Sequence, residues 1–572
     1  MDEVDDIEDA VLGDDPRSGR ALPPAVVLRG SSRTADCSSE CDARDDARAA
    51  GVPGSARVWV KTFGCSHNTS DSEYMVGMLT TYGYAVLGDG ERDAADLWLI
   101  NTCTVKSPSQ SAMDTVIAAG KAAGKPLVVA GCVPQGDRNA EALDGLSLLG
   151  VTQIDRVVEA VQETLKGNTV RLLQKKALPS LDLPKVRRNA HVEILPLSTG
   201  CLGACTYCKT VHARGRLGSY APEALLARAA AAVADGVTEI WLSSEDTGAY
   251  GKDIGTNISA LLAELVKVLP PDGRTMLRLG MANPPFILDQ LDGIAAALNH
   301  PCVYSTIHIP VQSGSNAVLS AMNREYTVQE FCTCVDGLKR RVPGLGVHTD
   351  IICGFPGETD EEFAETLALV ERYHFPVINI SQFYSRPGTP AAKMRKTPSQ
   401  VVKQRSRAMT ALHESYSPHD IWVGTHQRCW FTETAADGVN LAGKTKSGVQ
   451  VIVAPAPGLM GKSAMVHITA ASRWSVSGTL EHVVESSQPE ESSASVRESA
   501  VSDDAEVEAS SQSAPATILP QVAPTVVHSV SLSDKMAFSR TAEWTEAALW
   551  AGVALGLAGV TLSALFHLAR RT

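Results

Sequence analysis

The 572-residue chain lacks the features of a secreted protein. Residues 1–6 are mostly acidic and no early apolar run follows them, so we expect no secretory signal. The 13 cysteines are neither the even number nor the dense set of a small disulfide scaffold, which favours reduced thiols in the cytosol. With 44% hydrophobic and 20% charged residues, most of the chain can instead build several folded domains.

The central part of the chain also lacks a strong charge of either sign. The net charge of −13 lies near the ends: residues 1–50 carry 13 acidic and 6 basic side chains, and residues 481–546 carry 12 and 3. Residues 51–480 are left with a net charge of +1, so the overall acidity does not exclude an RNA partner. We predict a disordered acidic tail over 1–56 and a disordered linker over 483–546.

One segment contains no charged residue. Residues 547–568 have no Asp, Glu, Lys or Arg, and a helix of that length spans roughly 33 Å, about the thickness of a bilayer core. Trp544 and Trp550 lie at its start and Arg570 and Arg571 at its end, as residues at the two membrane interfaces would. We predict a single transmembrane helix that anchors the chain by its tail, with the remainder in the cytosol; a buried core helix is the alternative.

Between the acidic stretches, short apolar runs alternate with helical patterns, which is typical of α/β domains. Strands at 58–61, 97–101 and 127–130 and helices at 70–82 and 108–123 predict a flavodoxin-like domain over 57–175, followed by a linker at 176–190. Six strand–helix units predict a partial (βα)6 barrel over 191–421, with strands at 193–197, 239–242, 277–280, 304–308, 347–352 and 377–382 and helices such as 222–234 and 361–373. Short β-type runs at 427–432, 448–453 and 463–470 predict a small β-barrel over 422–482.

The strongest chemical signal is a set of three cysteines after the first barrel strand. Cys201, Cys205 and Cys208 have the spacing C-x3-C-x2-C, and a tight loop of this kind can direct three thiolates to one metal centre. In a 4Fe-4S cluster, three thiolates leave one iron open, and an open metal position usually means chemistry. A zinc site with His212 as its fourth ligand is the alternative.

A second set of cysteines follows the strands of the first domain. Cys65, Cys103 and Cys132 each stand just past the carboxyl end of a predicted parallel strand. Because such ends meet at one edge of a sheet, the three thiols can converge and hold a second cluster with an open iron. Three unrelated buried thiols are the alternative. We expect no ligand role for the other cysteines.

A C-x3-C-x2-C loop at this place in a βα barrel resembles the radical S-adenosylmethionine (SAM) superfamily. The resemblance implies that Cys201, Cys205 and Cys208 are catalytic cluster ligands and that SAM binds the open iron. It also implies SAM contacts at the ends of later strands, which are Ser243, Ser244, Glu245, Gln312, Ser313, Gly354 and Gly357. The glycines would let the backbone approach the adenine.

The order of a three-cysteine domain, a radical SAM barrel and a terminal β-barrel resembles the methylthiotransferases, whose last domain is an RNA-binding TRAM domain. Residues 201–215, 244–255 and 382–394 are similar to the eukaryotic and archaeal branch, which methylthiolates N6-threonylcarbamoyladenosine in tRNA, 3′ of the anticodon. The resemblance implies two 4Fe-4S clusters, SAM, the tRNA anticodon stem-loop and an electron donor of unknown identity. Animal members of this branch end in a transmembrane helix, which implies the endoplasmic reticulum membrane.

The terminal β-barrel is expected to bind RNA through basic and aromatic side chains. These are Arg428, Lys444, Lys446, Lys462, His467, Arg473, Trp430, Phe431 and Trp474. Arg214, Arg216 and Arg386 are candidates for pairing with the carboxylate of the threonylcarbamoyl group.

Two other functions stay open. One is methylthiolation of isopentenyladenosine in tRNA, or of an aspartate in a ribosomal protein. The other is a catalytically inactive, membrane-tethered scaffold, against which stands the presence of all six cluster cysteines.

Overall fold

The computed structural model describes residues 52–104 and 107–484, with no side-chain description for 107–110. Residues 485–546 of the predicted linker, the segment 547–568 and residues 1–51 of the acidic tail therefore lie outside the described residues, whereas Val483, predicted to begin the linker, ends a strand. Within the described ranges, no helix is both long and apolar enough to cross a membrane.

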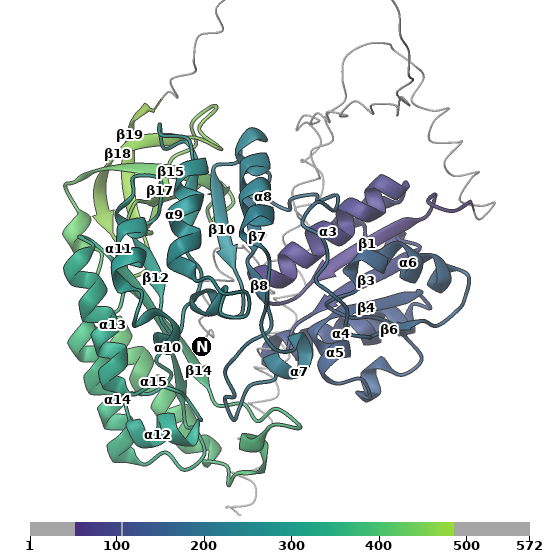
Figure 1. Cartoon of the computed structure of the whole chain (residues 1–572), viewed down its shortest axis with the longest axis horizontal. Helices are drawn as coiled ribbons and strands as arrows, with labels where there is room; N and C mark the ends of the chain where they lie inside the picture. Colours follow the sequence, from purple (N-terminus) through teal and green to yellow (C-terminus); the bar gives the residue numbers. More distant parts are fainter. Residues whose placement is uncertain (1–51, 105–106, 485–572) are drawn as a thin grey trace, which may run out of the picture. The chain divides into compact units, whose positions relative to one another are not determined.

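The first domain is a parallel six-stranded sheet with helices on both faces (Figure 1). Its strands are β1 (Arg57–Thr62), β2 (Ala85–Leu87), β3 (Leu97–Thr102), β4 (Leu127–Gly131), β5 (Ser147–Leu149) and β6 (Arg171–Leu172). Its helices are α3 (Ser66–Tyr82), α4 (Ser107–Ala122), α5 (Cys132–Gly136) and α6 (Val157–Leu165). The strand order β2-β1-β3-β4-β5-β6 is the doubly wound, flavodoxin-like order with one short strand added. The three predicted strands and two predicted helices are confirmed.

The second α/β part contains all six predicted barrel strands. They are β7 (Val192–Pro196), β10 (Glu239–Ser243), β11 (Met276–Arg278), β12 (Thr306–His308), β13 (Gly346–Cys353) and β14 (Val377–Gln382). Parallel pairing gives the orders β11-β10-β7 and β12-β13-β14. Parallel bridges from Leu277 to Val303 and from Met281 to His308 join the two halves.

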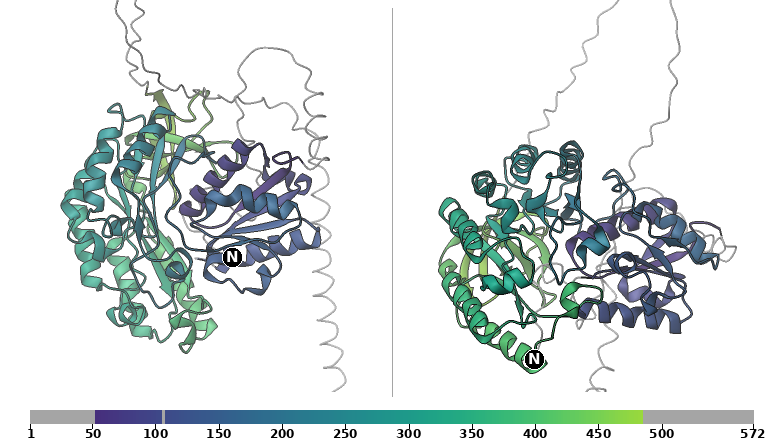
Figure 2. Two further views of the ribbon diagram at one scale, coloured as in Figure 1. Left: turned by 45° about the vertical axis from the view of Figure 1, so that its right-hand side comes forward. Right: turned by 60° about the horizontal axis from the view of Figure 1, so that its bottom comes forward.

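An outer layer of helices covers these strands (Figure 2). It comprises α8 (Pro222–Ala234), α9 (Ile258–Val268), α10 (Pro284–Ile287), α11 (Leu291–Asn299), α12 (Asn316–Ala321), α13 (Val328–Arg341), α14 (Asp360–Tyr373) and α15 (Ser399–Glu414). Capping boxes fix the starts of α13 and α14, where Thr327 and Thr359 accept from the main-chain N–H groups of Glu330 and Glu362. The short helix α7 (Thr210–Arg214) and the strands β8 (Ser198–Thr199) and β9 (Gly218–Ser219) follow β7.

The last part is a closed antiparallel and parallel β-barrel in the order β15-β16-β17-β19-β18. Its strands are β15 (His426–Thr434), β16 (Leu441–Thr445), β17 (Gln450–Val453), β18 (Ser463–Ala471) and β19 (Val476–Val483). The sequence predicted three of them. It did not reveal β16 or β19. In β16, Gly443 interrupts the apolar pattern because a Cβ there would lie 2.7 Å from both the Phe431 ring and the Trp430 carbonyl oxygen.

Two aromatic side chains that were expected to stack on RNA bases are buried, one where the β-barrel packs on the α/β barrel and one in the β-barrel core. Trp430 is 3% exposed, and its indole N–H donates to the carbonyl oxygen of Gly273 at 2.7 Å. Phe431 is fully buried in the core of the β-barrel. The expectation is therefore wrong for both rings, because neither can reach a nucleic acid. Trp474 is 40% exposed, so the prediction that its ring stacks on an RNA base stays open.

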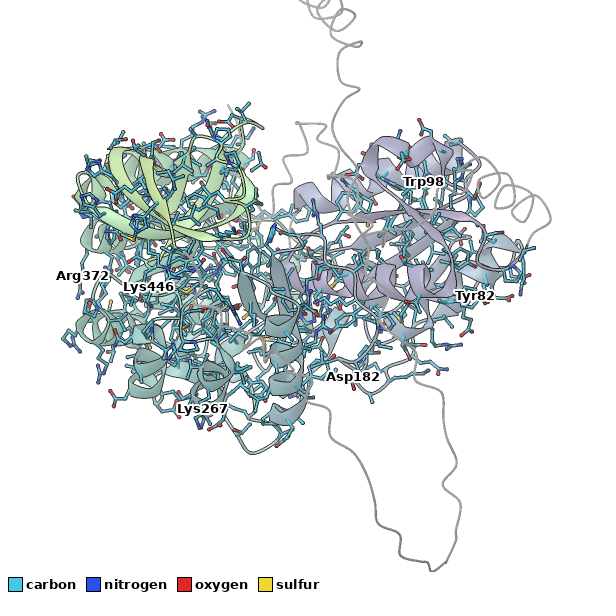
Figure 3. All side chains as sticks on the ribbon, turned by 90° about the horizontal axis from the view of Figure 1, so that it is seen from above. Tyr82, Trp98, Asp182, Lys267, Arg372 and Lys446 are labelled. Atoms are coloured by element: carbon cyan, nitrogen blue, oxygen red, sulfur yellow. The ribbon has the colours of Figure 1, made fainter. Side chains whose placement is uncertain are left out.

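Most of the basic side chains expected to bind RNA also face inward. Arg428 donates to the carbonyl oxygen of Asp272 at 2.9 Å, and Arg473 donates to that of His413 at 2.8 Å. The ammonium of Lys446 donates to the carbonyl oxygen of Leu298 at 2.9 Å, among other contacts where the two barrels meet (Figure 3). Arg428 and Lys446 thus join the β-barrel to the α/β barrel through main-chain carbonyl groups.

Two further members of the set point outward. Lys462 is exposed, and the His467 ring stacks on His426 with a centroid distance of 4.8 Å. Of the five Lys and Arg residues in the set, Lys462 alone keeps its charge at the surface of the described residues, so the β-barrel by itself presents little positive charge.

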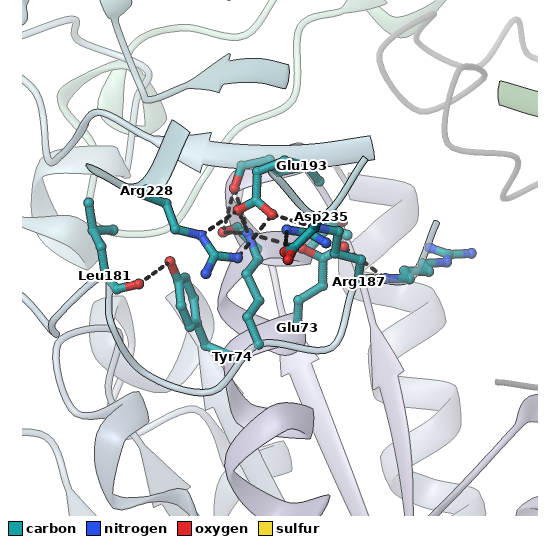
Figure 4. A network of polar contacts seen from close by, with 12 residues as sticks. Glu73, Tyr74, Leu181, Arg187, Glu193, Arg228 and Asp235 are labelled. Carbon is teal, nitrogen blue, oxygen red and sulfur yellow. Dashed lines mark hydrogen bonds and ion pairs between the residues drawn. The ribbon is translucent and has the colours of Figure 1, made fainter. Parts of the chain in front are cut away.

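Residues 176–190 contain neither strand nor helix, but a buried ion network holds them in place (Figure 4). The ammonium of Lys185 is fully buried, 2.9 Å from Glu193 Oε1 on β7 and 3.2 Å from Glu73 Oε2 on α3. Arg187 and Arg228 also bond to Glu193. Burial alone would raise the pKa of Glu193, but the three cations outweigh it and lower the pKa to about 2. The segment thus fastens the first domain to the barrel.

The Lys444–Glu239 pair yields a stability prediction. Glu239 is fully buried, 3.2 Å from the Lys444 ammonium and bonded to the Tyr304 hydroxyl. Replacing Lys444 by Met leaves that carboxylate without its countercharge, so we expect a loss of about 3–5 kcal/mol in the free energy of unfolding. Urea denaturation of the described region at pH 7 measures it.

Acid should remove this difference. Burial raises the pKa of Glu239, but Lys444 and the hydrogen-bond donors lower it on balance below the ordinary value of 4.5. The stabilisation is therefore present above that value and is lost as the pH falls through the folded pKa. Lys462→Met, at the exposed lysine of the same β-barrel, is the control and should change stability by less than about 0.5 kcal/mol. Equal effects of the two substitutions would contradict the prediction.

Candidate functional site

The C-x3-C-x2-C loop follows β7 and lies between the short strands β8 and β9. The main-chain N–H of Gly203 donates to Cys201 Sγ at 3.3 Å, and that of Thr210 donates to Cys208 Sγ at 3.3 Å. A Cβ on Gly203 would lie 3.6 Å from Cys201 Sγ and 3.8 Å from Cys205 Sγ, so these two sulfurs face the same glycine. All three thiols are partly exposed. The structure thus gathers the three cysteines around one loop.

An arginine ties this loop to the neighbouring strands. Arg324, after α12, donates from Nη1 to Cys205 Sγ at 3.2 Å and from Nη2 to the side-chain oxygen of Asn283. Asn283 in turn donates to Asp246 Oδ2 at 2.8 Å. Burial raises the pKa of Asp246 to about 6, although Asn283 opposes that shift. Sequence reasoning missed Arg324 and Asn283, because neither stands in a recognisable motif.

The cysteines of the first domain meet at the carboxyl edge of its sheet. Cys65 precedes α3, Cys103 follows β3, and Cys132 begins α5 after β4. The sheet order reverses between β1 and β3, so Cys65 and Cys103 flank the switch point at which doubly wound sheets bind ligands. Their thiols are hydrogen bonded, which lowers the pKa of Cys65 to about 7. Cys132 Sγ lies 3.6 Å from Asn68 Oδ1.

Both thiol sets have donor chemistry that fits an iron–sulfur cluster. Among the described residues, no three His, Cys, Asp or Glu side chains gather closely enough around one point to hold a single metal ion. The described residues therefore give no support to a zinc site with His212. A 4Fe-4S cluster takes each thiolate at a different iron, so its ligands need not meet at one point, and two sets of three cysteines suit it.

The first domain and the barrel touch where these two sites face each other. Ser66, at the start of α3, has its hydroxyl oxygen 2.8 Å from that of Ser243, at the end of β10. His67 Nδ1 lies 3.2 Å from Glu245 Oε1. Ser243 and Glu245, which the resemblance assigned to SAM, therefore contact the first domain in this structure.

A buried arginine completes this contact. Arg214, the last residue of α7, is 5% exposed. Its guanidinium lies 2.7 Å from Asp71 Oδ2, 2.6 Å from Asn68 Oδ1 and 3.1 Å from Glu245 Oε1. It also lies beside Cys132, where burial raises the pKa of the thiol to about 11 and the arginine's charge opposes that rise. The expectation that Arg214 pairs with a substrate carboxylate is wrong, because the guanidinium is already paired with the carboxylates of Asp71 and Glu245.

The other two arginines proposed for the substrate differ in exposure. Arg386 is half-buried and donates from Nη1 to the carbonyl oxygen of Tyr207, inside the cysteine loop, at 3.0 Å. Arg216 is exposed beside the same loop. Arg216 and Arg386 stay predictions.

Two of the predicted SAM contacts lie at the end of β12. Gln312 has a backbone φ of 70°, and its main-chain N–H donates to the Asp350 carbonyl oxygen at 2.8 Å. Its side-chain nitrogen is 3.4 Å from Asp350 Oδ2, while His308 Nε2 lies 2.8 Å from Oδ1 of the same carboxylate. Ser313 is fully buried and its hydroxyl contacts that of Thr366 on α14. Gln312 is thus placed among polar groups at the strand ends, whereas Ser313 fixes the loop to a helix.

The remaining predicted contacts also divide. A Cβ on Gly354 would lie 2.6 Å from Val402 on α15, so the missing side chain permits helix packing. Gly357 has a φ of 90° with open space where a Cβ would be, which leaves its backbone accessible. Ser244 is partly exposed and its hydroxyl accepts a main-chain N–H two residues on.

Two family models match the chain. The radical SAM superfamily matches residues 195–370, and a family described as "Uncharacterized protein family UPF0004" matches residues 57–146. A solved radical SAM methyltransferase from Kitasatospora setae superposes with a TM-score of 0.44 and 16% identity, covering 59% of this chain and 75% of that chain.

Curated relatives match most of the chain. The threonylcarbamoyladenosine tRNA methylthiotransferase of Xenopus laevis is 49% identical over 484 residues, covering 83% of this chain and 86% of the relative. The human protein of that name is 48% identical and covers 83% of each chain. A probable archaeal counterpart from Pyrococcus abyssi is 38% identical over 64% of this chain and 87% of its own. The chain belongs to the family of threonylcarbamoyladenosine tRNA methylthiotransferases.

Proposed function

We propose that the protein methylthiolates N6-threonylcarbamoyladenosine in tRNA, 3′ of the anticodon, at C2 of the adenine. One observation carries this: each α/β part holds a three-cysteine set, and polar contacts next to these sets, Ser66 with Ser243, His67 with Glu245 and Arg214 with Asp71, join the two parts. The relatives at 48–49% identity bear the name of this activity, which favours it over methylthiolation of isopentenyladenosine or of a ribosomal protein.

Two 4Fe-4S clusters are the cofactors that these residues suit. Cys201, Cys205 and Cys208 would hold one, and Cys65, Cys103 and Cys132 the other. Bound with SAM, the barrel cluster would supply the one-electron cleavage that yields a carbon radical, which unactivated aromatic C–H chemistry requires. The presence of both complete thiol sets argues against an inactive scaffold.

The protein's own groups prepare the thiols and set the distance between the two sites. Burial raises the pKa of the Cys205 and Cys132 thiols, and a fixed positive charge beside each one opposes that rise: Arg324 donates to Cys205, and Arg214 lies beside Cys132. The contacts of Ser66 and His67 hold the start of α3 against the end of β10. Such fixed placement replaces an encounter between separate partners and reduces the entropy lost in reaching the reactive geometry.

We also propose that residues 547–568 anchor the protein to the endoplasmic reticulum membrane, with the enzyme on the cytosolic side. The segment has no charged residue over the length of a bilayer-spanning helix, with Trp and Arg near its ends.

Iron content tests the cluster assignment. After anaerobic reconstitution, the wild-type chain should bind about eight irons, and Cys201→Ala and Cys65→Ala should each lose about four. Cys201→Ala should also abolish reductive SAM cleavage, whereas Cys65→Ala should retain it. Colorimetric iron assay and chromatography of 5′-deoxyadenosine measure these. Cys332→Ala, at a partly exposed cysteine on α13, is the control and should retain all the iron; full iron content in Cys201→Ala would refute the assignment.

Mass spectrometry of tRNA nucleosides tests the substrate. Cells without the protein should lack 2-methylthio-N6-threonylcarbamoyladenosine and accumulate its unmethylthiolated precursor. Re-expression of the wild-type chain should restore the product, and Cys201→Ala should not. Loss of 2-methylthio from isopentenyladenosine, with the threonylcarbamoyl form intact, would show that the substrate is the other nucleoside.

Glycosylation tests the membrane topology. An Asn-x-Ser/Thr sequon appended after Thr572 should be glycosylated in cells, because it would lie in the lumen. A sequon placed before Met1 should stay unmodified. Modification of the N-terminal sequon would contradict a cytosolic enzyme, as would a protein that remains soluble after alkaline extraction.

A further inference from the structure

A long stretch of the barrel contains no acidic residue. Residues 372–413 include neither Asp nor Glu, although the whole chain has 64 of them in 572 residues. The stretch carries eight basic residues, which are Arg372, Arg386, Lys393, Arg395, Lys396, Lys403, Arg405 and Arg407. Such a one-sided charge attracts polyanions.

Three of these arginines have structural partners. Arg405 is buried, 2.7 Å from Glu358 Oε2, and Arg372 lies 3.0 Å from Asp336 Oδ2. Arg386 donates to the cysteine loop. Arg405 and Arg386 hold the surrounding segment in place, and Arg372 forms an ion pair at the surface.

The other five basic side chains are exposed. Among the described residues, no carboxylate lies within ion-pair distance of any of the five, which are Lys393, Arg395, Lys396, Lys403 and Arg407. We call these five residues the basic track. Their charge faces water without an internal partner, in contrast to the lysines and arginines that join the β-barrel to the α/β barrel.

The basic track begins beside the cysteine loop. It starts in the short helix η5 (Pro390–Lys393), where the N–H of Ala391 donates to the carbonyl oxygen of Thr206, between Cys205 and Cys208, at 2.9 Å. It ends on α15, where Lys403 and Arg407 are four residues apart and therefore share one helix face. The residues of α15 that pack inward, such as Val402 and Met409, lie on another face.

The acid-free stretch also contains an exposed aromatic side chain. Tyr384, between β14 and η5, is 46% exposed. Exposed rings next to basic side chains suit single-stranded RNA, because bases stack on the rings while the cations contact phosphates.

We propose that the basic track docks the phosphate backbone of the tRNA anticodon stem-loop and directs it to the cysteine loop, with Tyr384 stacking on an unpaired base. This inference rests on the proposed function and names the surface that receives its substrate. Phosphate contacts fix the position and register of a nucleic acid. Their place beside the cysteine loop would therefore determine which nucleotide reaches the reactive site.

Binding of a fluorescently labelled anticodon stem-loop to the full chain tests the proposal. Replacing all five residues of the basic track by Gln should raise Kd at least tenfold at about 0.1 M salt. It should also reduce the slope of log Kd against log salt by about three or more, because fewer phosphate contacts form and fewer counterions are released on binding. SAM cleavage without RNA should be unchanged, which shows that the variant is folded. Tyr384→Ala alone should raise Kd about tenfold through lost stacking.

A matched variant controls for the loss of charge. This variant replaces five exposed basic residues elsewhere by Gln, which are Lys166, Lys252, Lys267, Arg274 and Arg340. Lys267 is labelled in Figure 3. This variant should bind the stem-loop within twofold of wild type. Equal weakening by both variants would overturn the proposal, since only overall charge would then matter.

Two other outcomes separate the alternatives. If the basic-track variant binds RNA normally but loses binding to vesicles containing phosphatidylserine, the surface faces a membrane and the proposal is wrong. If the wild-type chain does not bind the stem-loop at all, the proposed function fails, and the docking surface fails with it.

Discussion

The buried guanidinium of Arg214 is the interaction on which the arrangement of the two cysteine sites depends. It joins Asp71 and Asn68 of α3 to Glu245 after β10. Burying an arginine is costly unless carboxylates and hydrogen-bond acceptors surround it. Since these partners come from both α/β parts, the charge is satisfied only when the parts meet in one register. That register also places Cys132 next to the guanidinium.

The same principle governs the junction with the β-barrel. Lys444 meets Glu239, and Lys446 and Arg428 meet carbonyl groups of the α/β barrel. Positive charge that would suit RNA is thus used within the protein. The net charge near zero over residues 51–480 does not reveal which basic residues have partners inside the protein and which do not.

The sequence predicts the elements of this fold better than it predicts their contacts. Strands such as β3 and β13 and helix α8 are recognisable because apolar runs and turn residues are local signals, and strand ends place Cys65, Cys103 and Cys132 at one edge. The exposure of a side chain depends on segments far away in the sequence. Nothing near Trp430 in the chain indicates that Gly273 covers it. Contacts between distant segments, such as Arg324 with Cys205, leave no pattern in a single sequence.

The Lys185 network has a consequence for modularity. Its charges come from α3, from residues 176–190, from β7 and from α8, so no cut between the two α/β parts leaves every charge paired. A fragment ending after β6 would leave Glu73 without its cation, and a barrel beginning at β7 would lose two of the cations on Glu193. The first domain is therefore not a portable module. Chimaeras that exchange it between relatives should carry α3 together with the segment through Glu193, and retain an arginine at position 228.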